Sequence, residues 1–170
     1  ISTDRLIESF KEKYFDKIKF SEESRIIREV LDFLPDKANL FISNSSPVRD
    51  LDNFGQLLNK DIKIYNNRGA SGIDGITSTA IGIAIDSKQP TILISGDLSF
   101  YYDINTLVNL KNIHSPFIIV LINNNGGGLF RALPVSSDKK YFDEYFLTSQ
   151  NLNFKKIITA FSVEYKEVKN

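Results

Sequence analysis

Apolar residues along the chain follow two different spacings, and these spacings predict the elements of the fold. Short runs rich in apolar residues and bounded by turn residues are typical of buried strands; they lie at 39–43, 91–95 and 117–122, and 62–65, which Lys63 interrupts, is a further predicted strand. Apolar residues three and four positions apart indicate helices, which we expect at about 22–34, 47–54, 76–85, 102–113, 141–146 and 154–161. A further short strand is expected near 163–165. This alternation favours an α/β fold, a doubly wound and mainly parallel sheet with helices on both faces.

The length and composition fit one domain with a normal core. The chain has 170 residues, of which 42% are hydrophobic and 25% are charged, as in ordinary globular domains. We assign 21–170 to this domain and expect it to be cut short at its C-terminus. We assign 1–20, which begins with Ile1 rather than Met and carries a helical pattern, to a linker or helix that leads from a preceding domain.

Charge and residue usage exclude several classes of function. The 21 basic and 21 acidic residues cancel, so nothing in the net charge favours a nucleic acid or an anionic membrane as partner. With no Cys and one His, disulfides, thiolate metal sites and paired-His catalysis are excluded. No apolar run approaches the ~20 residues of a membrane span, and no signal-peptide core is present. We therefore expect a cytoplasmic protein.

Polar and glycine-rich segments follow all four predicted strands, at 44–49, 67–75, 96–99 and 123–128. Ligands of open parallel sheets bind beyond the carboxyl ends of the strands. Asn124 follows Asp97 by 27 residues, about one helix plus one strand, so neighbouring parallel strands would bring both to one edge. Their oxygens suit Mg²⁺, and nearby hydroxyls and helix N-termini suit phosphate. The pattern predicts a Mg²⁺ and diphosphate site; the alternative is that Asp97 caps a helix beside a plain Asn-Gly turn.

Four segments also resemble a known family. Gly96-Asp97 followed by Asn123-Asn124 resembles the thiamine diphosphate motif, although Gly96-Asp-Leu-Ser99 lacks the third Gly of the broad pattern. Together with Asn67-Arg-Gly-Ala-Ser-Gly-Ile-Asp-Gly75, Asn123-Asn-Asn-Gly-Gly127 and Asn44-Ser-Ser-Pro-Val-Arg49, these blocks resemble the 2-succinyl-5-enolpyruvyl-6-hydroxy-3-cyclohexene-1-carboxylate (SEPHCHC) synthase family. The likeness covers about 39–134 and implies a C-terminal domain with the thiamine diphosphate-binding fold.

The resemblance implies a role for particular residues. It implies Mg²⁺ (or Mn²⁺) ligands at Asp97, Asn124 and the carbonyl of Gly126. It implies thiamine diphosphate contacts at Asn44, Ser45, Ser71, Ile73, Gly96, Asp97, Leu98, Ser99 and Asn124, with Ile73 under the bent cofactor. Substrate contacts fall on Arg49, Arg68, Leu129, Phe130 and Leu133. The substrates of the family, 2-oxoglutarate and isochorismate, are both dicarboxylates, and an arginine guanidinium can donate two parallel hydrogen bonds to one carboxylate. The two arginines therefore suit the substrates that the resemblance implies.

The implied activity is that of a transferase of menaquinone biosynthesis. Such an enzyme decarboxylates 2-oxoglutarate and adds the succinyl unit to isochorismate. The Glu that activates the cofactor is expected on an N-terminal domain, usually supplied by a second subunit of a homodimer or dimer of dimers. We therefore expect no catalytic residue in this chain and no activity of the chain alone.

Three alternative functions stay open. Another thiamine diphosphate enzyme, such as an acetolactate-synthase-like decarboxylase, would share Asp97 and Asn124 but not the 67–75 block. A dinucleotide-binding oxidoreductase is disfavoured because Gly69, Gly72 and Gly75 lack the G-x-G-x-x-G spacing after the first strand. A non-catalytic phosphate-binding module would bind the cofactor without turnover.

Overall fold

Four parallel strands form the centre of the fold. The computed structural model describes residues 22–56 and 59–168. The strands are β1 (Ala38–Ile42), β2 (Ile62–Tyr65), β3 (Thr91–Gly96) and β4 (Phe117–Ile122), in the order β2-β1-β3-β4. From β1 the chain moves outward to β2, and from β3 it moves outward to β4. The carboxyl ends of β1 and β3 therefore border the crevice at which doubly wound sheets bind ligands.

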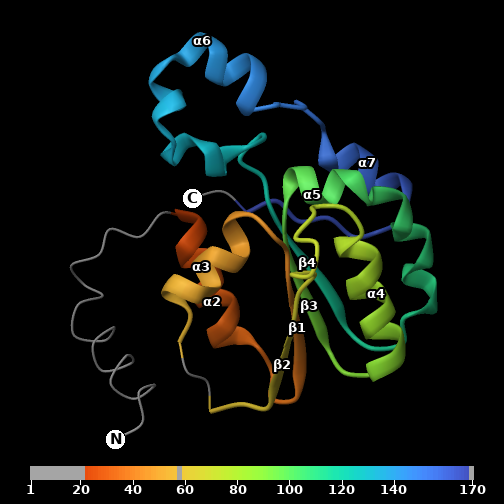
Figure 1. Ribbon diagram of the computed structural model, residues 1–170. Helices are drawn as coiled ribbons and strands as arrows, with labels where there is room; N and C mark the ends of the chain where they lie inside the picture. The colour runs from red at the N-terminus through yellow and green to blue at the C-terminus, as the bar shows by residue number, and fades with distance from the viewer. Residues whose placement is uncertain (1–21, 57–58, 169–170) are drawn as a thin grey trace, which may run out of the picture.

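Helices cover both faces of this sheet, as Figure 1 shows. One face carries α2 (Glu22–Phe33) and α3 (Ser46–Phe54), and α4 (Ile76–Ser87) lies on the other face. The remaining helical segments are α5 (Asp97–Tyr102), η2 (Ile104–Asn112), η3 (Gly128–Ala132), η4 (Pro134–Ser137), α6 (Lys139–Tyr141), η5 (Phe142–Phe146) and α7 (Phe154–Ala160). The segment that contains α6 extends beyond the carboxyl ends of the strands. The expected fold class is confirmed.

The two-residue period of the strands divides the core into two sides. Leu40 and Ile42 of β1 pack with Ile27 and Leu31 of α2. The neighbouring Phe41 points to the opposite face of the sheet and packs with residues of α4. A third cluster joins α5, η2 and α7 through Phe100, Leu107, Phe154 and Ile158. Both faces of β1 and β3 are buried, which explains why their sequences read as continuous apolar runs.

Three expected elements differ in the structure. We expect a single helix over 102–113, but the structure has two helical segments there. The helix α5 begins directly after β3 at Asp97 and ends at Tyr102, and the 3₁₀ helix η2 (Ile104–Asn112) follows it. The helix expected over 141–146 is a π-helical segment, η5. The described part of the chain has no strand near 163–165; Val163 and Tyr165 instead pack against the third cluster. The expected helix or linker at 1–20 lies outside the described residues.

Among the described residues, no helix combines the length and the apolar character that crossing a membrane requires.

Candidate functional site

Asp97 connects the loops that follow β3 and β4. It is the first residue of α5, directly after β3, and is only 6% exposed. Its Oδ1 accepts a hydrogen bond from the backbone N–H of Leu98 at 3.0 Å, and its Oδ2 accepts one from Gly126 at 2.8 Å. Burial raises the pKa of this carboxyl above its ordinary 3.8, while the N–H groups of Leu98 and Gly126 act in the opposite direction. A bound cation would favour the ionised form.

Asn124 lies at the same edge with one of its polar atoms unpaired. Its Nδ2 donates a hydrogen bond to Oε1 of Glu23 at 2.8 Å, whereas its Oδ1 is buried and has no hydrogen-bond partner within residues 22–56 and 59–168. Leaving such an acceptor unpaired costs about 1–3 kcal/mol. Mg²⁺ takes carboxylate, amide and carbonyl oxygens as ligands. Oδ1 of Asn124 and the carboxylate of Asp97 are therefore suitable ligands for a hard divalent cation at this edge, beside the carbonyl oxygen of Gly126, which accepts a hydrogen bond from the N–H of Gly128 at 2.9 Å.

This set of donors contains a single carboxylate. No group of three or more His, Cys, Asp or Glu residues that could hold a metal is found within 22–56 and 59–168. A cation at this edge would depend on neutral amide and carbonyl oxygens beside Asp97. Such a site suits Mg²⁺ that shares its coordination sphere with phosphate oxygens.

The glycines after Asn124 are required by close approaches. Gly126 has a φ of +130°, and a Cβ there would overlap the carbonyl oxygen of Leu147. The N–H of Gly127 donates to that same oxygen at 2.6 Å. A Cβ on Gly128 would lie 2.5 Å from Nδ2 of Asn124. Glycine is therefore needed at 126, where the carbonyl of Leu147 lies against the loop, and at 128, where the side chain of Asn124 lies against the backbone.

Asn44 holds together the loops that follow β1 and β2. Its side chain is 2% exposed. Its Nδ2 donates to the carbonyl oxygens of Asn67 at 3.0 Å and Gly72 at 2.5 Å, and its Oδ1 accepts from Nη1 of Arg68 at 3.1 Å. The amide, expected to contact the cofactor, has its donors and acceptor engaged within the protein. These bonds join the turn after β1 to the 67–75 loop.

The 67–75 loop is also tied to the end of β3. Ser99, which is buried, donates from Oγ to the carbonyl oxygen of Ile73 at 2.8 Å. Ser71 is exposed, has a φ of 57°, and donates to the carbonyl oxygen of Arg68 at 3.0 Å. Both hydroxyls are therefore paired within the protein, and Ser99 brings Ile73 to the start of α5.

Two arginines gather at the turn after β1. Arg49 donates from Nη1 to the carbonyl oxygen of Ser45 at 2.6 Å, while Arg68 bonds to the preceding Asn44. Ser45 has a φ of 75°, an uncommon value outside glycine. The two guanidinium groups thus bond to adjacent residues of one turn, Arg49 to the backbone of Ser45 and Arg68 to the side chain of Asn44.

A hollow borders this arginine region, and an apolar segment extends beyond the sheet. The hollow has a volume of about 430 Å³ and is lined by Asn66, Asn67, Arg68, Gly69, Ala70, Gly72 and Asp74.

Phe130 and Leu133, expected to bound the substrate side together with Leu129, are 40% and 46% exposed. The ring of Phe130 meets Phe146 edge-on at a centroid distance of 6.1 Å.

The structure thus brings some of the predicted residues together and adds one. Asp97 meets Gly126, and Ser99 meets Ile73; Asn44 meets Arg68. Glu23 was missed, because it lies 101 residues before Asn124 and belongs to an ordinary amphipathic helix. No motif spacing could have indicated this contact.

Comparison with a family model shows the family to which the chain belongs. Residues 57–170 match the model of the thiamine pyrophosphate enzyme, C-terminal TPP-binding domain family. The chain belongs to this family of thiamine diphosphate-binding domains.

The more specific likeness is to SEPHCHC synthases. The chain is 44% identical over 149 residues to the 2-succinyl-5-enolpyruvyl-6-hydroxy-3-cyclohexene-1-carboxylate synthase of Listeria monocytogenes, covering 88% of this chain and 26% of that protein. It is 42% identical over 151 residues to the synthase of Leuconostoc mesenteroides, covering 89% of this chain and 28% of that protein. The expected resemblance is confirmed. The chain spans about a quarter of the length of these curated relatives.

A solved structure supports the fold alone. Benzoylformate decarboxylase from Polynucleobacter necessarius superposes with a TM-score of 0.70 at 15% identity, covering 89% of this chain and 29% of the other. The individual contacts of cofactor, metal and substrate remain predictions of the sequence and geometry.

Proposed function

We propose that this chain is the cofactor-binding domain of a SEPHCHC synthase, a thiamine diphosphate- and Mg²⁺-dependent transferase of menaquinone biosynthesis. The whole enzyme would decarboxylate 2-oxoglutarate and add the succinyl unit to isochorismate. The proposed metal site rests on one observation. Oδ1 of Asn124 is buried at the same edge as Asp97 and has no hydrogen-bond partner among the described residues. The identity to SEPHCHC synthases supports the choice of reaction.

The residues at the carboxyl edge would hold the cofactor through its diphosphate. Asp97, Oδ1 of Asn124 and the carbonyl of Gly126 would bind Mg²⁺, or Mn²⁺ in its place. Gly96, Leu98 and Ser99 at the start of α5 would lie along the phosphates, where backbone N–H groups favour negative charge. Thiamine diphosphate, when bound, supplies stabilisation of a carbanion at the former carbonyl carbon. Ile73, placed by Ser99, would support the bent cofactor.

Arg49 and Arg68 would pair with substrate carboxylates. Both bond to the turn at 44–45, and Arg68 also lines the hollow beside the loop. A guanidinium presents two parallel N–H donors to a carboxylate and stays charged at every physiological pH. Leu129, Phe130 and Leu133 would exclude water on the substrate side.

The remaining parts of the catalytic site would come from outside this chain. The acid that activates the cofactor would belong to an N-terminal domain, contributed by a second subunit of a homodimer or dimer of dimers. This assembly, and a cytoplasmic location, rest on the family resemblance.

A paired assay tests the proposal. The isolated chain and the intact protein would each be incubated with 2-oxoglutarate, isochorismate, Mg²⁺ and thiamine diphosphate, and CO₂ and the SEPHCHC product would be measured. We expect product from the intact protein and none from the chain alone. Preferential release of CO₂ from pyruvate by the intact protein would replace the proposal with an acetolactate-synthase-like activity. Cofactor binding without turnover of any 2-oxo acid would make the protein a binding module.

A further inference from the structure

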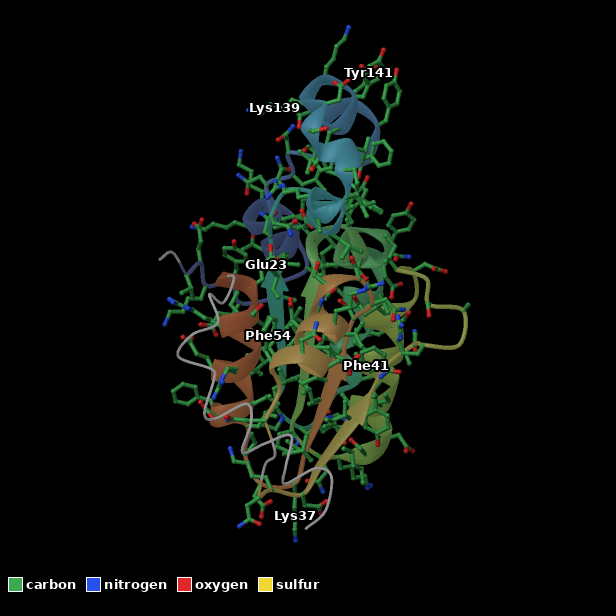
Figure 2. The ribbon with its side chains drawn as sticks, turned by 60° about the vertical axis from the view of Figure 1, so that its left-hand side comes forward. Glu23, Lys37, Phe41, Phe54, Lys139 and Tyr141 are labelled. Carbon is green, nitrogen blue, oxygen red and sulfur yellow. The ribbon has the colours of Figure 1, made fainter. Side chains whose placement is uncertain are left out.

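Glu23 makes a contact that determines how the Asn124 amide is oriented. Its Oε1 accepts from Nδ2 of Asn124 at 2.8 Å, joining α2 to the loop after β4. Figure 2 shows Glu23 towards the end of α2 that lies away from Lys37, which directly precedes β1. Glu23 therefore stands at the carboxyl edge of the sheet, where the candidate metal site lies.

The chemistry of the two groups leaves one orientation for the amide. An ionised carboxylate only accepts hydrogen bonds, whereas an amide has a donor end and an acceptor end. The NH₂ group of Asn124 must therefore face Glu23. Its Oδ1 then points away from Glu23, and this atom is buried without a hydrogen-bond partner in the part of the chain that the structure describes.

We propose that Glu23 is a positioning residue that holds the amide of Asn124 with its oxygen directed at the divalent cation. This inference rests on the proposed metal site and adds a residue from outside the cofactor motifs. Without Glu23 the amide could rotate by 180° and present its NH₂ group, which cannot bind a cation. Partners that orient metal ligands typically change metal affinity by about 10–100-fold.

The experiment measures metal binding rather than turnover. Mn²⁺ would be titrated into the intact protein with thiamine diphosphate present, and free Mn²⁺ would be followed by electron paramagnetic resonance. We expect Glu23→Ala to raise the Mn²⁺ dissociation constant by about tenfold or more. Glu23→Gln, whose Oε1 still accepts from Asn124, should stay within about threefold of wild type. Glu29→Ala, an exposed change on the same helix, is the matched control and should have no effect.

A double-mutant cycle separates positioning from a direct effect of charge. In an Asn124→Ala background, Glu23→Ala should cause no further loss, because Glu23 acts through Asn124. An unchanged dissociation constant in Glu23→Ala would overturn the inference. So would a loss in Glu23→Gln equal to that in Glu23→Ala, or an undiminished effect in the Asn124→Ala background.

Two controls separate the role of Glu23 from a loss of the fold and from an error in the metal site. The melting temperature of each metal-free variant shows whether the fold is intact. Glu23→Met, which keeps the length of the side chain without the carboxylate and should raise the dissociation constant as Glu23→Ala does, covers the case in which Glu23→Ala fails to fold. Asp97→Ala tests the metal site itself. If Asp97→Ala leaves Mn²⁺ binding unchanged, the proposed metal site is wrong. If it abolishes binding while Glu23→Ala has no effect, only the role of Glu23 is wrong.

Discussion

The carboxylate of Asp97 accepts a hydrogen bond from the backbone N–H of Gly126 at 2.8 Å, although 29 residues separate the two in the chain. This bond holds together the ends of the neighbouring strands β3 and β4. It places the one buried carboxylate of the described edge beside the loop that carries Asn124. The candidate metal site is therefore formed by the pairing of two strands rather than by a local motif.

Asp97→Ala should abolish Mg²⁺-dependent binding of thiamine diphosphate in the intact protein. The change removes the only charged oxygen donor of the proposed cation site. Isothermal titration calorimetry with and without Mg²⁺ measures the loss directly. Asp86→Ala, at an exposed position of α4, is the control and should bind normally. Unaltered binding in Asp97→Ala would refute the assignment of the metal ligand.

Gly128→Ala should weaken Mg²⁺ binding by roughly tenfold while the protein stays folded. The added Cβ would lie 2.5 Å from Nδ2 and 3.1 Å from Cγ of Asn124, so this amide must move. Gly82→Ala is a matched control in α4, where a Cβ meets nothing within 4 Å. That variant should keep its metal affinity and gain about 0.5–1 kcal/mol in the free energy of unfolding. Equal metal affinity in both variants would contradict the prediction.

Asn44→Ala should destabilise the fold by about 2 kcal/mol, as measured by urea denaturation. The substitution leaves the carbonyl oxygens of Asn67 and Gly72 without their buried donor. Amide hydrogen exchange over 66–75 should become faster, because the loop loses its attachment to β1. The exposed neighbour variant Asn66→Ala should change stability by less than about 0.5 kcal/mol. If the two variants were equally stable, Asn44 would not be the organiser of this loop.

Asp50→Asn should stabilise the protein at neutral pH and not in acid. Burial, with Glu23 as the weaker cause, raises the pKa of Asp50 above its ordinary 3.8. Ionisation therefore costs more in the folded chain than in the unfolded one. This penalty is present at neutral pH, falls as the pH drops through the native pKa, and is absent below 3.8, where both states are protonated.

The melting temperatures of wild type and Asp50→Asn, measured at two pH values, test the direction of this pH dependence of stability. We expect the variant to melt about 1–3 °C higher at pH ~7 and at the same temperature near pH ~3. The small size reflects partial exposure of the carboxyl. Asn at this position can still accept from Ser24, as Asp50 does at 3.2 Å. The exposed change Asp52→Asn on the same helix is the control. A larger advantage in acid than at neutral pH would show the sign to be wrong.

Arg68→Ala should raise the KM for a dicarboxylate substrate by roughly tenfold or more, since hydrogen bonds to charged groups contribute about 1.5–3 kcal/mol. The affinity for thiamine diphosphate should change less. Steady-state kinetics of the intact enzyme, together with calorimetry of the cofactor, measures both quantities. Arg25→Ala, exposed on α2, is the control. A larger loss in cofactor affinity than in KM would move Arg68 out of the substrate site.

The parallel α/β sheet, and the edge at which the candidate site lies, could be predicted from the order of apolar and polar segments in the chain. The apolar runs of β1 and β3 are continuous because helices cover both of their faces. The polar segments that follow the strands share one edge because the strands are parallel. The resemblance to SEPHCHC synthases could likewise be read directly from the blocks around Arg68, Asp97 and Asn124.

The contacts of individual side chains at this edge could not be predicted in the same way. Asn44, which the resemblance places at the cofactor, also bonds through its amide to the carbonyl oxygens of Asn67 and Gly72 in the next loop. Glu23, which belongs to no motif, sets the direction of the Asn124 amide. The physical reason is that a hydrogen bond depends on which donor and acceptor meet in space. Periodicity and motif spacing describe faces and edges of elements, and carry no information on such distant pairings.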